Sequence, residues 1–244
     1  MDLLAELEKR PLLCDGGMGT QLMAAGMPPG TNSLLWNAER PDVIREVHGR
    51  YRAAGCELIT TNSFQGSRRA LSAHGLEGRL AELNRAAATL AREAAGSGAV
   101  VLADAGPFGG FVEPVGDTTE EELTGIFIEQ LTALREGGAE AVIIETMSDP
   151  AEVRIAVKAA KRVASWPVIA TYAFQRGPHG SVTMMGTTVE RALDEAVDAG
   201  ADVVGANCGT GLELDDYLRL AGELVSAADR TPVILQPNAG APRE

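Results

Sequence analysis

The sequence predicts an α/β protein folded as a (β/α)₈ barrel, of which about seven β-α units are present and the eighth strand is missing. Short β-branched runs alternate with longer helical stretches along the 244 residues, which is typical of a parallel sheet. Three of the helix-to-strand joints also share one residue pattern. No GxGxxG follows the first strand, so a doubly wound open sheet is the less favoured alternative.

The elements follow one another in a regular order. Strands are expected at Leu12–Asp15, Glu57–Thr61, Ala99–Asp104, Ala141–Glu145, Val168–Tyr172, Asp202–Ala206 and Val233–Gln236. Helices are expected at Pro41–Ala54, Leu76–Ala95, Thr119–Glu136, Pro150–Ala164, Val189–Ala199 and Leu214–Ala227. Two helices have start signals: the Asp117-Thr-Thr-Glu run, and Asp149 as an N-cap followed by Pro150.

The shared joint pattern is a small residue, glycine, any residue, an acid and then an apolar strand, as in AGCELITTN, GGAEAVIIET and AGADVVGAN. The glycine is expected to end the helix in the left-handed conformation. Seven residues after Gly55, Gly138 and Gly200 come Asn62, Glu145 and Asn207, and Asp15 and Asp104 end two further strands. In a (β/α)₈ barrel this end of the sheet carries the active site. The alternative is that these side chains only cap the following loops.

The residue inventory restricts the chemistry. The lysines lie in helical or N-terminal stretches, which disfavours a Schiff-base aldolase, and no GxSxG motif is present. We expect His48 and His74 on surface helices or loops, whereas His179 lies in a loop that can reach the top of the barrel. Cys208 is the thiol placed for chemistry, as a nucleophile or a metal ligand.

The other two cysteines are expected to pack. Cys56 precedes its strand, at the opposite end of the barrel, and the side chain of Cys14 is expected on the face opposite Asp15. Three cysteines are too few for a disulfide scaffold, and the N-terminus lacks a signal sequence, so we expect a cytoplasmic protein. A net charge of −13 and the absence of a long apolar run disfavour nucleic acid and membranes as partners.

Five blocks in order, LLCDGGMGTQL, ELITTNSF, VIIETMSD, GANCGTG and QPNAG, resemble the signature blocks of the homocysteine S-methyltransferase family. That family includes the N-terminal domain of cobalamin-dependent methionine synthase, S-methylmethionine-dependent enzymes and the betaine-dependent enzyme. The similarity runs from Leu12 to about Gly240, so residues 1–244 are interpreted as one homocysteine-binding barrel domain, C-terminally truncated relative to the family.

The resemblance implies a catalytic zinc held by three cysteines, of which Cys208 matches the first, and a homocysteine thiolate that attacks a methyl donor. It further implies that Glu145 holds the homocysteine ammonium and that Asp15, with the amides of Gly16 and Gly17, fixes the amino-acid end. By the same resemblance Asn207 and Asn238 orient substrate or ligands, and Thr61 and Asn62 line the pocket.

The chain departs from the family at its C-terminus. The family's remaining zinc ligands are a Cys-Cys pair in a GGCCG block, whereas this sequence ends at QPNAGAPRE, and one cysteine cannot complete the site. Seven strands also leave two unpaired barrel edges. A fragment of a longer protein is the favoured explanation; a partner or second copy that supplies the unit, or a relative without zinc, are the alternatives.

The methyl donor is expected to be methylcobalamin on a corrinoid-binding partner or domain, because the stretch at 60–76 looks closest to the cobalamin-dependent type. The chain itself has no DxHxxG corrinoid motif. S-methylmethionine is the second candidate donor. A non-catalytic homocysteine-binding or regulatory protein is the alternative from another functional class, and a phosphate-binding barrel is disfavoured because no basic residue stands beside CGTG.

Overall fold

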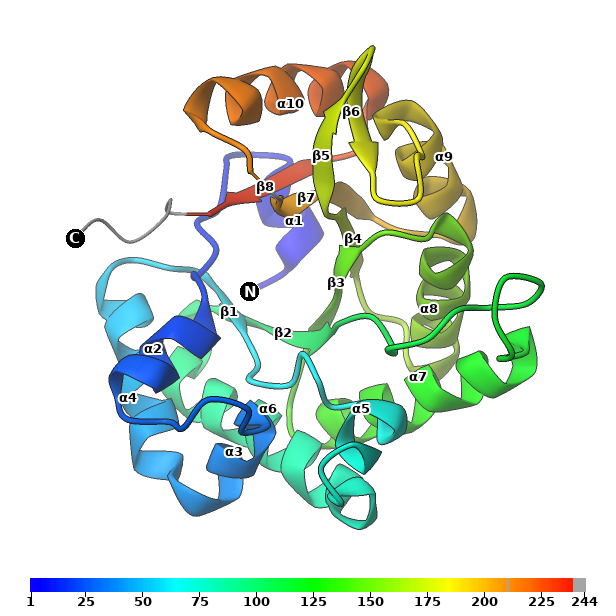
Figure 1. Cartoon of the computed structure of the whole chain (residues 1–244). Coiled ribbons are helices and arrows are strands. Elements are labelled where there is room, and N and C mark those ends of the chain that lie inside the picture. The colour runs from blue at the N-terminus through cyan, green and yellow to red at the C-terminus, as the bar shows by residue number, and fades with distance from the viewer. Residues whose placement is uncertain (210, 239–244) are drawn as a thin grey trace.

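A parallel sheet that curls into an incomplete barrel forms the centre of the molecule (Figure 1). The computed structural model describes residues 1–209 and 211–238. Six strands pair in the order β1-β2-β3-β4-β7-β8, and every neighbouring pair is parallel. Their bounds are β1 Leu58–Thr60, β2 Val100–Ala105, β3 Ala141–Met147, β4 Val168–Tyr172, β7 Val203–Cys208 and β8 Val233–Pro237. The incomplete (β/α)₈ barrel predicted from the sequence is therefore confirmed.

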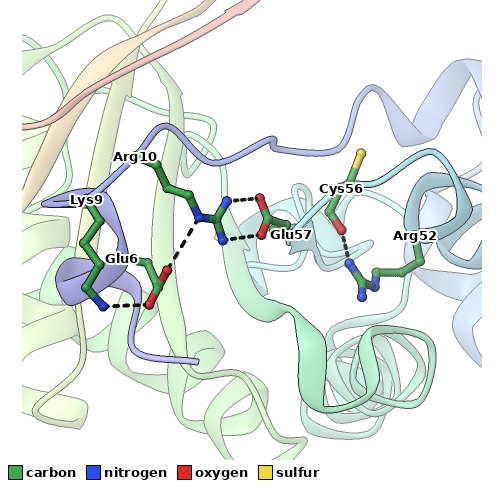
Figure 2. Close-up of polar contacts among 6 residues, drawn as sticks. All are labelled: Glu6, Lys9, Arg10, Arg52, Cys56 and Glu57. Atoms are coloured by element: carbon green, nitrogen blue, oxygen red, sulfur yellow. Dashed lines mark hydrogen bonds and ion pairs between the residues drawn. The ribbon is translucent and has the colours of Figure 1, made fainter.

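The first predicted strand, residues 12–15, occupies a seventh position beside β1 but pairs only through the bridge between Cys14 and Leu58. An ion pair on the N-terminal side of this bridge fixes the segment. The two terminal guanidinium nitrogens of Arg10 donate to the carboxylate of Glu57, at 2.8 and 2.7 Å (Figure 2). Glu6, one helical turn before Arg10, lies 3.6 Å from the same guanidinium group. The N-terminal segment is thus held in register with β1 by contacts that precede the bridge in the chain.

Helices cover the outside of the sheet, as Figure 1 shows. The six predicted helices are α4 Pro41–Ala53, α6 Leu80–Ala95, α7 Glu120–Glu136, α8 Pro150–Val163, α9 Val189–Ala199 and α10 Leu214–Ala227. The structure adds short elements that the sequence did not predict: α1 Leu3–Leu7, α2 Met18–Ala24, α3 Trp36–Glu39, α5 Arg68–Ser72 and the hairpin of β5 Phe174–Gly177 with β6 Gly180–Thr183. Among the described residues, none of the helices has the length and apolar character needed to cross a membrane.

The repeated joints behave as predicted. Gly55, Gly138 and Gly200 have φ angles of 97°, 104° and 107°, a region that residues with a side chain avoid. Asp149 caps α8 by accepting from the amide of Ala151 at 2.9 Å. The Asp117 start signal is wrong by two residues, because Thr119 is the N-cap of α7 and shares a capping box with Glu122.

Two hydrophobic layers position the strands. Inside the curl, side chains such as Leu58, Leu102 and Ile143 form one buried cluster, and Leu3 of α1 packs against it from the N-terminal ends of the strands. The larger cluster lies between the sheet and the surrounding helices. His48 corrects a sequence prediction: it is fully buried on α4, whose inward face packs against α6, rather than exposed on the surface.

The sheet is open between β8 and residues 12–15. In the described part of the chain, no strand pairing joins these two edges, and one side-chain contact crosses the opening, from Nε2 of Gln236 to Sγ of Cys14 at 3.5 Å. The unpaired edges predicted from seven strands are present. On α10, next to β8, the side chains of Leu214, Leu218 and Val225 are exposed by 64–73%.

Candidate functional site

Three acidic side chains lie at the C-terminal ends of parallel strands: Asp15 beside β1, Asp104 on β2 and Glu145 on β3. They are close enough for the charges of Glu145 and Asp15 to raise the pKa of Asp104, and for Asp15 to raise the pKa of Glu145. None of the ion pairs among the described residues involves any of the three. The acidic cluster is therefore buried without a counter-ion, which favours the protonated forms of its carboxyl groups.

Asp15 is held rigidly by Thr60 at the end of β1. The amide of Thr60 donates to Oδ2 of Asp15 at 2.9 Å, and its hydroxyl donates to Oδ1 at 2.7 Å. Burial raises the pKa of Asp15 to about 6, although both hydrogen bonds from Thr60 favour the ionised form. The Asp15 carboxyl group is thus fixed in place, and a bound cation would stabilise its ionised form.

Glu145 lies at an irregularity in β3, where the register with β4 shifts between Ile144 and Met147. A bulge of this kind changes the direction of a side chain at a strand end. Burial raises the pKa of Glu145 to about 7, and the Thr146 hydroxyl at 3.5 Å is its hydrogen-bond donor. Asp104 is 5% exposed, and its Oδ1 has no hydrogen-bond partner among the described residues. Both side chains therefore have acceptor capacity left for a ligand.

Cys208 ends β7 in the left-handed region, with a φ of 53°, and its side chain is partly buried. Its carbonyl accepts from the hydroxyl of Tyr217 on α10 at 2.7 Å, and its sulfur lies 3.6 Å from Nδ2 of Asn207. Burial and the charge of Glu145 raise the pKa of the Cys208 thiol. In the protein alone this thiol therefore stays protonated at neutral pH. Glu145 and Asp104 of the acidic cluster lie close enough to influence its ionisation.

The structure places Cys14 differently from the prediction. Its side chain does pack against the interior cluster, but Sγ lies 3.6 Å from Oδ1 of Asp15 rather than on the opposite face. The reason is that regular strand pairing in this segment is limited to Cys14, so alternation of side chains does not extend to Asp15. Cys56 is buried in the outer cluster, as predicted.

The remaining predicted site residues divide into two sets. Asn238 donates to the carbonyl of Gly209 at 3.3 Å, beside Cys208, and Gly16 and Gly17 lie next to Asp15 where the Tyr51 hydroxyl reaches the Gly17 carbonyl. Thr61 and Asn62 are buried and bonded elsewhere. The Thr61 hydroxyl contacts Ser63 and accepts from the Asp104 amide, whereas the Asn62 amide donates to Ser33 and Asn37.

Sequence reasoning did not select several hydroxyl residues that organise the site: Thr60, Thr146, Thr171 and Tyr217. Each threonine stands next to, or across from, a polar strand-end residue. A search for hydroxyl side chains within one residue of the predicted strand ends would have found Thr60, Thr146 and Thr171. Tyr217 lies within a helix, and nothing in its local sequence distinguishes it.

Comparisons with known proteins identify the family of this chain. The family model described as homocysteine S-methyltransferase matches residues 12–244. The chain belongs to the homocysteine S-methyltransferase family. It is 31% identical to the methionine synthase of Mycobacterium tuberculosis and 30% identical to that of Mycobacterium leprae, in each case over 99% of this chain and 21% of the relative. The chain thus spans about a fifth of the length of these relatives.

Solved structures agree with the family assignment. The homocysteine methyltransferase MmuM from Escherichia coli superimposes with a TM-score of 0.78 in its metallated form and 0.76 in its oxidized form. The sequence identities are 24% and 25%, and the matches cover 97% and 98% of this chain and 86% of each solved chain. This family member therefore shares the fold of those enzymes over nearly its whole length.

Proposed function

We propose that this chain acts, as a single barrel domain, in the transfer of a methyl group to the thiol of homocysteine, which gives methionine. The observation that carries the proposal is the acidic cluster of Asp15, Asp104 and Glu145, which lies beside Cys208 and has no counter-ion among the described residues. Buried carboxylates without a partner are costly, and a ligand ammonium group removes that cost. Membership of the homocysteine S-methyltransferase family supports the same substrate.

In this proposal Asp15 and Glu145 bind the ammonium group of homocysteine, and Asp104, whose raised pKa favours the neutral form, offers its unpaired Oδ1 as a further acceptor. The two hydrogen bonds from Thr60 keep Asp15 pointed at the ligand, so little conformational freedom is lost on binding. Gly16 and Gly17 allow the backbone to approach the amino-acid end of the substrate. Homocysteine is then oriented with its sulfur toward Cys208 and the open end of the barrel.

The zinc centre implied for this family does not fit the described residues. No three His, Cys, Asp or Glu side chains in that part of the chain are grouped as a metal site, and Cys208 lies beside the amides Asn207 and Asn238 rather than beside further thiols. A catalytic zinc needs three protein ligands. We therefore propose that Cys208 supplies one ligand, that the chain alone holds much less than one zinc, and that it transfers methyl groups weakly or not at all.

The methyl donor is proposed to be methylcobalamin carried by a separate corrinoid-binding module, with S-methylmethionine as the second candidate. The relatives named methionine synthase are about five times longer than this chain, which leaves room in them for such a module. We also propose that further polypeptide, either one more β-α unit or a second copy, covers the open edge of β8. A cytoplasmic location is proposed as well, because Cys14, Cys56 and Cys208 are free thiols.

Binding of L-homocysteine, measured by calorimetry, tests the role of the acidic cluster. Affinity is expected to rise from about pH 5.5 to about pH 7.5, because Asp15 and Glu145 must ionise to hold the ammonium group. The analogue 4-mercaptobutanoate, which lacks the amino group, is expected not to bind. Glu145→Gln is expected to weaken binding, whereas Glu152→Gln, a change to a buried carboxyl that binds the Phe108 amide, is expected to leave it unchanged. Equal affinity for the analogue would contradict the proposal.

Zinc content and turnover test the remainder. Zinc per chain is measured beside a Cys208→Ser control, and methionine formation is assayed with each donor singly. Stoichiometric zinc and rapid turnover by the isolated monomer would overturn the account of the metal site.

A further inference from the structure

The exit of β3 contains a strained residue next to Glu145. Thr146 has a φ of 59°, in the left-handed region, where a β-branched side chain is rarely found. Residues in such conformations persist when surrounding contacts hold them, and they are concentrated at functional sites. The strain occurs at the register shift between Ile144 and Met147 that redirects Glu145.

One side chain holds Thr146 in this conformation. The amide group of Asn207 donates from Nδ2 to the Thr146 hydroxyl at 2.6 Å and accepts, at Oδ1, from the Thr146 backbone amide at 3.0 Å. Asn207 belongs to β7, which is separated from β3 by β4 in the sheet. On β4, the hydroxyl of Thr171 donates to the same Oδ1 at 2.9 Å, so the asparagine is fixed from both strands.

The two ends of this contact are adjacent to the two groups of the proposed site. Thr146 follows Glu145 directly, and its hydroxyl lies 3.5 Å from the Glu145 carboxylate. Asn207 precedes Cys208, which is itself in the left-handed region, and Nδ2 lies 3.6 Å from the Cys208 sulfur. A single buried amide therefore connects the backbone that carries the carboxylate with the backbone that carries the thiol, across an intervening strand.

We propose that Thr146 is a positioning residue which, locked to Asn207, sets the direction of Glu145 and the position of the Cys208 sulfur relative to one another. The inference deepens the proposed function, because it rests on Glu145 and Cys208 as the groups that face homocysteine. Two hydrogen bonds to one amide group fix the orientation of Thr146 relative to Asn207. By contrast Asn62, another strand-end asparagine, bonds to Ser33 and Asn37 and connects no two barrel strands.

The test compares Thr146→Val, which keeps the shape and removes the hydroxyl, with Thr146→Ser, which restores it. Three quantities are measured in the full chain: the alkylation rate of Cys208 by iodoacetamide, followed on its own peptide, the affinity for L-homocysteine, and the stability in urea. We expect Thr146→Val to change the rate of Cys208 alkylation at least threefold and to weaken homocysteine binding about tenfold. Thr146→Ser is expected to return both values to those of the parent.

Two further variants separate positioning from folding. Thr146→Gly removes the hydroxyl and relieves the backbone strain, so it is expected to fold and still to show an altered rate of Cys208 alkylation. Ile155→Val trims the buried core on α8, outside the hydrogen bonds that join Thr146, Asn207 and Thr171, and is expected to lower stability without altering alkylation. Unchanged alkylation in both Thr146→Val and Thr146→Gly, or an equal change in Ile155→Val, would overturn the proposal. If the parent does not bind homocysteine, the proposed function fails, and Cys208 alkylation alone decides about the lock.

Discussion

Replacing Glu145 by glutamine should change how stability depends on pH. Burial raises the pKa of Glu145 from 4.5 to about 7, so between these values the native state holds a proton that the unfolded chain has lost. The stability that the protonated form provides is complete below about pH 4.5 and is lost as the pH rises through about 7. Glu145→Gln imitates the protonated form permanently and should not lose it.

The magnitude follows from the shift. A change from 4.5 to about 7 corresponds to about 3 kcal/mol over the whole titration, of which about 2 kcal/mol falls between about pH 5.5 and about pH 7.5. Urea unfolding of the parent and the variant at these two pH values measures it. Glu46→Gln, which removes an equal charge from an exposed position on α4, is the control for net charge. If the stability difference between Glu145→Gln and the parent is the same at both pH values, the buried, unpaired carboxylate is refuted.

Three further predictions use other parts of the structure. Thr60→Val removes one of the bonds that favour ionised Asp15, so its pKa should rise above about 6 and homocysteine should bind roughly tenfold more weakly near pH 6.5, with Thr60→Ser close to the parent by calorimetry. Burial lowers the pKa of His48 to about 4, so protonation of this group should cost the parent about 2 kcal/mol of stability between about pH 7.5 and about pH 5, apart from the contributions of other groups. The stability difference between the parent and a His48→Leu variant in urea unfolding should change by that amount between the two pH values, and an unchanged difference would exclude this origin. Gly138→Ala should cost about 1–2 kcal/mol because its φ of 104° strains any side chain, whereas Gly222→Ala on the exposed side of α10 should be neutral or stabilising; equal urea midpoints for the two would contradict this.

The barrel could be predicted because its signals are local. At the joints of Gly55, Gly138 and Gly200 a helix ends and a buried strand begins within a few residues, and this repeated unit indicates parallel strands without any knowledge of distant contacts. The short elements α2, α3 and α5 could not be predicted in the same way. They comprise four to seven residues each, too few for a periodic pattern, and they form by packing against the longer helices.

The acidic residues and the thiol of the candidate site could be predicted from the sequence, whereas the contacts of the hydroxyl residues that hold them in place could not. Asp15, Glu145 and Cys208 end predicted strands, and the common direction of parallel strands brings such ends together. The partners Thr60 and Thr146 act through contacts between strands far apart in the sequence. His48 shows the opposite failure: a polar residue type predicted exposure, but helix packing buried it without a hydrogen-bond partner among the described residues.

Several energetically unfavourable features of the molecule lie at one end of the sheet. Raised carboxyl pKa values at Asp15 and Glu145 and left-handed backbone at Thr146 and Cys208 all occur where strands leave the core. At the other end, α1 closes the interior and the ion pair of Arg10 with Glu57 satisfies its own charges. A site that must stabilise a ligand's positive charge needs acceptors that the protein leaves unsatisfied, and the helix-covered sheet supplies the stability that allows it.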